Sequence, residues 1–91
     1  MKVRYTRSSL AQLNKILAHI EEHSPQGVRN VQARIQEVIA LIAAAPFIGR
    51  QTRKPNVRRF NTHPYPYLIF YQVTGSEIII RRIRHGARKP E

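Results

Sequence analysis

The sequence predicts an α+β domain with the element order β-α-α-β-β-β, in which a helical hairpin packs on one face of a small antiparallel sheet. Two observations support this fold class. Apolar residues recur at helical spacing from residue 10 to residue 44, whereas residues 57–85 contain short strand-like runs separated by turns. With 91 residues and 42% hydrophobic residues, the chain is expected to form a single domain, 1–91, with one core.

The N-terminal half begins with a short strand and continues into two helices. The segment "KVRYT" alternates apolar and charged residues, and Thr6, Ser8 or Ser9 can cap the helix that follows. The apolar face of that helix comprises Leu10, Leu13, Ile16, Leu17 and Ile20. Ser24 and Pro25 then suit the start of a second helix, which Pro46 would end.

The C-terminal half is expected to supply the rest of the sheet. The segment "PFIGRQTRKPN" indicates a loop, and "VRRFN" indicates a short strand. The segments "YLIFYQV" and "IIIRRIRH" are rich in β-branched and aromatic residues, and "TGSE" between them suits a tight turn. Short connections of this kind predict antiparallel neighbours.

The last strand changes character along its length. Strict alternation would place one set of side chains on one face, namely Ile79, Arg81, Ile83 and His85. The other face would carry Ile78, Ile80, Arg82 and Arg84. The strand is therefore expected to start buried from both sides and to leave the core with cations on both faces.

Charge is the most informative feature of the composition. Sixteen Lys and Arg residues face five Asp and Glu residues, a formal net charge of +11. Most of the excess lies after residue 49, and arginine predominates over lysine. Because the guanidinium group binds carboxylates and phosphates well, the chain is expected to bind RNA, DNA or an acidic protein.

Several classes of function lack a supporting pattern. There is no cysteine, and the scattered carboxylates form no paired acid/base site. His19 and His23 have the spacing of a helical metal pair, but no third ligand is evident, so a solvated helix face is the favoured interpretation and neither a metal nor a cofactor is expected. The longest apolar run, interrupted by Pro46, is too short for a membrane span. We expect a cytoplasmic protein.

Tyrosines near the cations offer a second possible binding feature. Tyr65, Tyr67 and Tyr71 are close in sequence to Arg58 and Arg59, and aromatic rings between cations can stack on bases. The alternative is that they pack in the core, which we favour for Tyr71. For Tyr65, in a turn, both interpretations stay open.

The order of these motifs resembles the RelE/ParE superfamily of toxins from bacterial type II toxin–antitoxin systems. The resemblance rests on "PFIGR", "VRRFN", "YLIFYQV" and "EIIIRRIRHGARKP", and it covers essentially the whole chain. The closing His-Gly-Ala-Arg, residues 85–88, is most similar to the ParE branch and the plasmid-stabilisation proteins. The resemblance implies a small basic toxin that is neutralised by a cognate antitoxin.

Two activities are implied by the superfamily. ParE-like members poison DNA gyrase and block replication, whereas RelE-like members cut mRNA on the ribosome. For the nuclease, the resemblance implies a catalytic set comprising Lys54, Arg58, Arg59, Arg81, Arg82 and His85. That set is incomplete: Gly86 stands where a tyrosine tends to follow, and Gln51 lies near the place of the loop Glu that some members use.

We therefore expect a gyrase poison that is not itself an enzyme, with the endoribonuclease as the alternative. Its target-binding surface would comprise Arg81, Arg82, Arg84, His85 and Arg88. The expected partners are an antitoxin with an acidic C-terminal segment and DNA gyrase, or the ribosome and mRNA in the alternative case. A plain nucleic-acid-binding module is a third interpretation, which makes no use of the resemblance.

Overall fold

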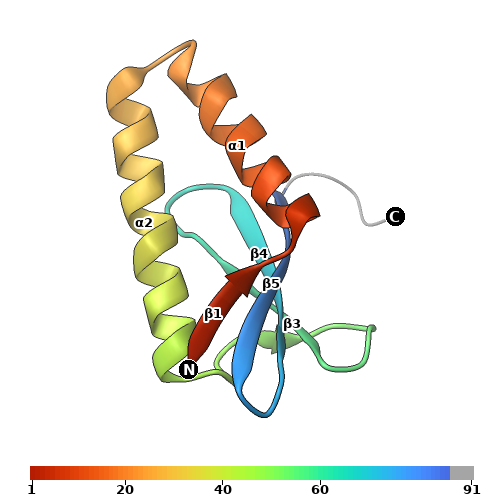
Figure 1. The fold of residues 1–91 in the computed structure, drawn as a ribbon. Helices are drawn as coiled ribbons and strands as arrows, with labels where there is room; N and C mark the ends of the chain where they lie inside the picture. Colours follow the sequence, from red (N-terminus) through yellow and green to blue (C-terminus); the bar gives the residue numbers. More distant parts are fainter. Residues whose placement is uncertain (87–91) are drawn as a thin grey trace.

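A computed structural model describes residues 1–86 and shows a two-layer α/β arrangement. The helical hairpin consists of α1 (Arg7–Glu21) and α2 (Pro25–Ala44). It covers one face of a five-stranded sheet (Figure 1) whose strands are β1 (Lys2–Tyr5), β2 (Arg50–Gln51), β3 (Val57–Asn61), β4 (Tyr67–Val73) and β5 (Glu77–His85). Within these residues, neither helix combines the length and the apolar character needed to cross a membrane.

Both helices begin at polar caps that the sequence contains. Thr6 is the cap of α1, and its side chain accepts a hydrogen bond from the Ser9 N–H. Ser24 caps α2 in the same way, with Pro25 in the first turn, where its missing N–H costs nothing. The helix ends at Ala44, before Pro46. The helical part of the prediction is confirmed, and the structure selects Thr6 among the three candidate caps.

The sheet is mixed and not wholly antiparallel, which corrects one part of the prediction. Its strand order is β1-β5-β4-β3-β2, and β1 runs parallel to β5. The first and last strands are therefore neighbours, and Val3 and Tyr5 lie opposite Ile78 and Ile80 on the helix-facing side. This pairing buries apolar side chains of β1 and covers the edge of β5.

The core lies between α2 and the central strands. Fully or almost fully buried residues from α2 meet those from β4 and β5, namely Val31, Ile35, Val38, Ile42, Ile69, Tyr71, Ile78, Ile80 and Ile83. Residues of α1 and β1 pack around this cluster. Consequently one face of the sheet is committed to packing, and no helix of residues 1–86 covers the opposite face, which we call the open face (Figure 1).

A β-bulge in β5 changes which side chains share a face. Phe70 lies opposite Arg82 and Tyr71 lies opposite Ile80, so Arg81 is the extra residue. Ile80 and Ile83 consequently both face the helices, and both are buried. The strict alternation expected for this strand is therefore wrong beyond Ile80, because one inserted residue reverses the phase.

The start of α1 stabilises the bulge. The Ile80 carbonyl accepts hydrogen bonds from the Thr6 N–H (3.0 Å) and from the buried Ser9 hydroxyl (2.7 Å). The Ile83 N–H donates to the Gln12 side-chain carbonyl at 2.9 Å. Beyond the end of β1, Ser9 and Gln12 of α1 thus make the hydrogen bonds to the edge of β5 that a neighbouring strand would otherwise make.

Candidate functional site on the open face of the sheet

A row of cations crosses the open face. The ladders place Arg82 of β5 opposite Phe70 of β4, Phe70 opposite Arg59 of β3, and Arg59 opposite Arg50 of β2. Directly opposed residues share a face, so three arginines and one aromatic ring form a continuous row. The row points away from the helices because Ile69 and Tyr71, the neighbours of Phe70, are in the core.

More cations flank this row. Arg84 lies one step further along β5, and its guanidinium carbon sits 5.2 Å from the centre of the Phe70 ring, within cation–π range. Arg81, at the bulge, donates to the Gln72 side chain at 3.3 Å, which brings it to the same side. With Lys2 and Arg4 of β1, the open face carries seven cations among residues 1–86, at positions 2, 4, 50, 59, 81, 82 and 84.

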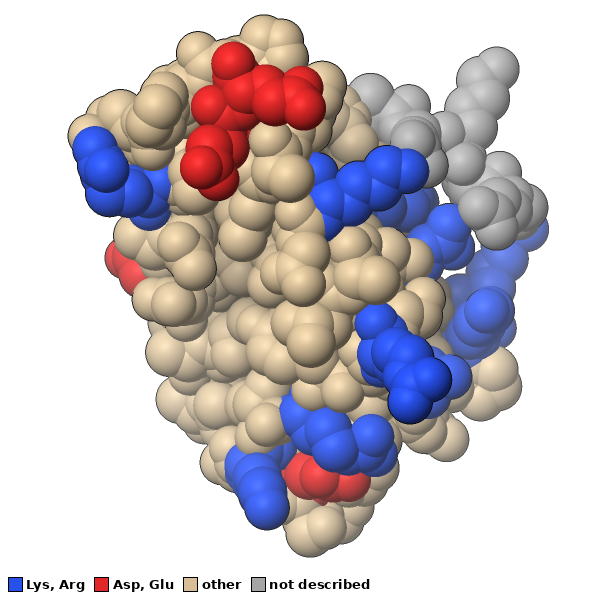
Figure 2. Space-filling view, turned by 45° about the horizontal axis from the view of Figure 1, so that its top comes forward, with Lys and Arg blue, Asp and Glu red and all other residues tan. Residues whose placement is uncertain are grey.

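Acidic side chains are nearly excluded from this surface. Among residues 1–86, Glu77 is the acid on the open face, and it forms an ion pair with Arg4 at 3.2 Å. The other acids of the described residues, Glu21, Glu22 and Glu37, belong to the helical hairpin. Figure 2 shows the most prominent acidic patch at its top, where the helices meet, and Lys and Arg side chains mainly along its right edge and bottom, where a further acidic patch lies among them. This separation produces a strongly positive surface.

The open face is also hollowed next to the cationic row. A shallow depression of about 490 Å³ runs from the loop after α2 to the end of β5 and is lined by Ile48, Arg50, Arg59, Phe60, Asn61, Leu68 and Gly86. The lining combines apolar side chains with two arginines. Such a surface suits an anionic group that is attached to an apolar or planar one.

Arg58 has a different role from its neighbour Arg59. It lies opposite Tyr71, on the side facing the helices, and donates to the carbonyls of Gly49 (2.8 Å) and Phe47 (3.2 Å). Its guanidinium also stacks over the Phe47 ring at 5.1 Å. Arg58 therefore holds the loop after α2 in place.

Tyr71 completes the attachment of this loop. Its buried hydroxyl donates to the Pro46 carbonyl at 2.8 Å and accepts from the Gly49 N–H at 2.9 Å. Burial raises the pKa of Tyr71, and the Gly49 hydrogen bond and the positive charge of Arg58 partly oppose that rise. The packing interpretation is thus confirmed for Tyr71. Tyr65 and Tyr67 are half-buried against the core.

His85 lies apart from the arginines of the row. It is opposite Tyr67, on the other side of the sheet from Arg82 and Arg84, and the two rings meet edge to face at 5.7 Å. Tyr67 and Tyr71, the partners of His85 and Arg58, are four positions apart on β4, a separation of about 13 Å. Arg58 is also bonded to the loop carbonyls of Phe47 and Gly49, so the structure does not bring it together with His85.

The loop residues of the nuclease set lie at the far end of β3. Lys54 and Gln51 line a second depression of about 300 Å³ together with Arg58. The structure thus brings Arg81, Arg82 and Arg84 together with Arg59, and Lys54 with Arg58, but not all six nuclease candidates.

Arg88 lies outside the described residues. Arg50 and Phe70 were missed, because only the strand register shows that they join the row.

The fold and the cationic sheet define a small toxin of the RelE/ParE superfamily, close to ParE. Residues 3–90 match the family model of the ParE toxin of type II toxin–antitoxin systems, parDE. The chain therefore belongs to the ParE toxin family.

Relatives agree with this assignment. A Sinorhizobium fredii (strain NBRC 101917 / NGR234) protein, named "Putative toxin Y4kP", is 32% identical over 85 residues, which cover 93% of this chain and 88% of that protein. The structure of a chromosomal ParDE toxin–antitoxin system from P. aeruginosa matches with a TM-score of 0.80 and 27% identity, over 93% of this chain and 95% of that chain.

A more distant structure shares the fold. In the E. coli DinJ–YafQ complex, the matching chain has a TM-score of 0.61 and 11% identity, over 94% of this chain and 93% of that chain. At this identity the match shows the architecture alone.

Proposed function

We propose that this protein is the toxin of a type II module, that a cognate antitoxin neutralises it, and that it poisons DNA gyrase without breaking bonds itself. The observation that carries this proposal is the open face, whose described side chains include seven cations but not His85. Such a surface can bind anions tightly, but its described side chains include no histidine, and its carboxylate, Glu77, is paired with Arg4. Membership of the ParE family supports gyrase as the target over the ribosome.

The binding surface would centre on the end of β5. Arg81, Arg82 and Arg84 would contact carboxylates or phosphates, and Phe70 would add an apolar contact among them. His85, the last residue of β5, lies on the other side of the sheet, so its part in target binding stays a prediction, as does that of Arg88. By holding the gyrase–DNA intermediate, the protein would block replication in the cytoplasm.

Supercoiling and DNA-cleavage assays with purified gyrase test this proposal. The wild-type protein should inhibit supercoiling and increase the amount of cleaved DNA. The double variant Arg82→Ala/Arg84→Ala should need about tenfold more protein for the same effect, a loss of about 1.4 kcal/mol. The control Arg7→Ala/Arg29→Ala removes the same charge from exposed positions of the helices and should behave as wild type.

Two results would overturn the gyrase proposal. One is wild-type protein that neither inhibits supercoiling nor raises cleavage. The other is an equal loss in the control variant, which would indicate a general charge effect. Steeply salt-dependent DNA binding without growth arrest would instead indicate a plain nucleic-acid-binding module.

The antitoxin would use an acidic C-terminal segment. The net charge of +11 favours such a partner, and the structurally similar ParDE proteins of P. aeruginosa are described as a toxin–antitoxin system. Exposed apolar side chains at Leu41 and Phe47 offer contact area, and Ile48 lines the depression that also contains Arg50 and Arg59. We expect a helix along the hairpin and an added strand at the sheet. If coexpression of the protein encoded by an adjacent gene does not restore growth, this pairing is wrong.

A ribosome-dependent mRNA endoribonuclease is the alternative function. The observation in its favour is the exposed His85, a possible acid/base, at the end of a strand that carries three arginines. In this case His85→Ala should abolish mRNA cleavage on translating ribosomes and relieve toxicity. Full toxicity of His85→Ala without any mRNA cleavage would remove this alternative.

A further inference from the structure

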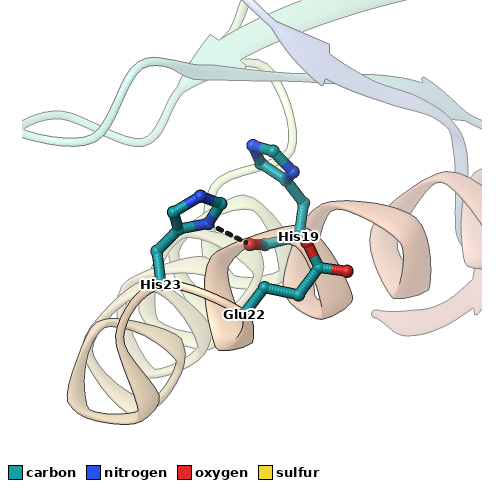
Figure 3. Close-up of side chains that lie close together, drawn as sticks. All are labelled: His19, Glu22 and His23. Carbon is teal, nitrogen blue, oxygen red and sulfur yellow. Dashed lines mark hydrogen bonds between the residues drawn. The ribbon is translucent and has the colours of Figure 1, made fainter.

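We propose that the end of α1 carries a binding site for a divalent transition-metal ion, with Zn²⁺ as the preferred ion and His19, Glu22 and His23 as its ligands. One potential ligand atom from each residue lies within 4.8 Å of the other two. Figure 3 shows the three side chains projecting from the same end of α1. This inference is independent of the proposed function.

The spacing of the residues brings the ligands together. His19 and His23 are four positions apart and Glu22 is three positions after His19, so the side chains lie on one side of the helical turn. The imidazole rings are 5.1 Å apart, centre to centre. Since all three side chains are exposed, χ rotation can bring the ligand atoms to about 3.3 Å from one another, as bonds of 2.0–2.1 Å to a tetrahedral ion require.

A hydrogen bond to the backbone prepares His23 for metal binding. Its Nδ1 lies 3.0 Å from the His19 carbonyl oxygen, drawn as the dashed line in Figure 3. A carbonyl can only accept, so Nδ1 carries the proton and Nε2 keeps the lone pair that a metal needs. Metal-binding histidines typically donate their second N–H in this way, which fixes the tautomer and the ring orientation.

The local charge favours a cation at this end of a basic protein. The site lies at the C-terminus of α1, the negative end of the helix dipole. Glu21 and Glu22 add two carboxylates, half of the four in residues 1–86. Lys15, one turn before His19, opposes this charge. Two imidazoles and one carboxylate suit Zn²⁺, Cu²⁺ and Ni²⁺ better than Mg²⁺ or Ca²⁺, which prefer oxygen ligands.

Calorimetric titration of the untagged protein with ZnCl₂ tests the site. We expect one Zn²⁺ per chain and a dissociation constant that His19→Gln and His23→Gln each raise by at least about tenfold, since each removes one of three ligands. Glu22→Gln should weaken binding as well. Two matched controls, Glu21→Gln and His63→Gln, should stay within about twofold of wild type, because neither removes a ligand.

A spectroscopic measurement distinguishes this site from adventitious binding. Cu²⁺ bound to wild-type protein should give an EPR spectrum with nitrogen couplings that lose one nitrogen in His23→Gln and keep both in His63→Gln. Circular dichroism should show an unchanged fold in every variant, as the ligands are exposed. The site is refuted if wild type binds no stoichiometric Zn²⁺, or if His63→Gln weakens binding as much as His19→Gln does.

Discussion

The two sides of the sheet use the same kinds of side chain for opposite purposes. Arg58 and Arg59 are consecutive, as are Phe70 and Tyr71, yet one member of each pair faces the helices and the other faces the open side. Arg58 and Tyr71 hold the loop after α2 through hydrogen bonds to backbone atoms. Arg59 and Phe70 belong to the cationic row.

Residue type therefore does not distinguish a binding arginine from a structural one in this protein. Alternation along β3 and β4 decides which residues face the helices and which face the open side, and the bulge at Arg81 decides this in β5. A basic surface can therefore form without disturbing the core, because each strand contributes alternate residues to each side. Variants on the two sides should consequently separate stability from target binding.

The largest effect is expected for Gly49→Ala in the loop on the helix-facing side. A Cβ at this position would lie 2.5 Å from the Tyr71 hydroxyl oxygen and 2.9 Å from the Arg59 carbonyl oxygen. Relieving these overlaps should cost about 3 kcal/mol of unfolding free energy, measured by urea denaturation. In Gly75→Ala the new Cβ meets nothing within 4 Å, so its effect should be small. Similar losses in both variants would contradict the proposed close packing.

Removing the Tyr71 hydroxyl should have the next largest effect. Tyr71→Phe leaves the buried Gly49 N–H and the Pro46 carbonyl without this partner, at a cost of about 1–3 kcal/mol. Tyr65→Phe is the matched control, because the Tyr65 hydroxyl makes no hydrogen bond to any residue in 1–86 and its loss should cost little. Equal denaturation midpoints for the two variants would show that Tyr71 does not hold the loop.

Alanine substitution at Arg58 and Arg59 compares the two sides directly. Arg58→Ala should cost about 1–2 kcal/mol of stability, since it removes charged hydrogen bonds to two carbonyls. Arg59→Ala should change stability by less than about 0.5 kcal/mol. It should instead weaken inhibition of supercoiling, measured at a temperature where both variants are folded. A reversed pattern would overturn the division between the two sides.

The smallest effect is expected at alkaline pH. Burial raises the pKa of Tyr5 above its usual value of 10.0, so the folded state disfavours the phenolate. As pH rises above 10, the unfolded chain loses this proton first, and the unfolding free energy falls. Denaturation at pH 8 and pH 11 should therefore show a smaller loss of stability in Tyr5→Phe than in wild type. An identical loss would mean that Tyr5 does not contribute.

Local patterns were sufficient for much of the fold. The start of α2, with its cap Ser24 and with Pro25 in the first turn, and its end before Pro46 depend on neighbouring residues, so the sequence predicted them correctly. Strands β3, β4 and β5 were likewise recognised from their composition. The two-residue strand β2 was missed, because a segment this short has no periodicity and is defined only by its pairing with β3.

The candidate site was predicted only in part, because it too depends on strand pairing. Its cations were evident, but the grouping of Arg50, Arg59 and Arg82 around Phe70 depends on the register of four strands. Glu22 was missed as a neighbour of His19 and His23, although its position three residues after His19 was a signal that the sequence contained.

The helices, the three longer strands of the C-terminal half, the basic character and the resemblance to ParE toxins could be recognised from the sequence, because these depend on local periodicity, caps and composition. The parallel pairing of β1 with β5, the bulge at Arg81 and the side of the sheet on which each arginine lies became evident only in the folded structure. Those features depend on contacts between distant segments: Thr6, Ser9 and Gln12 meet β5 more than 70 positions along the chain. A shift of one residue in that contact moves every later side chain of the strand to the opposite face.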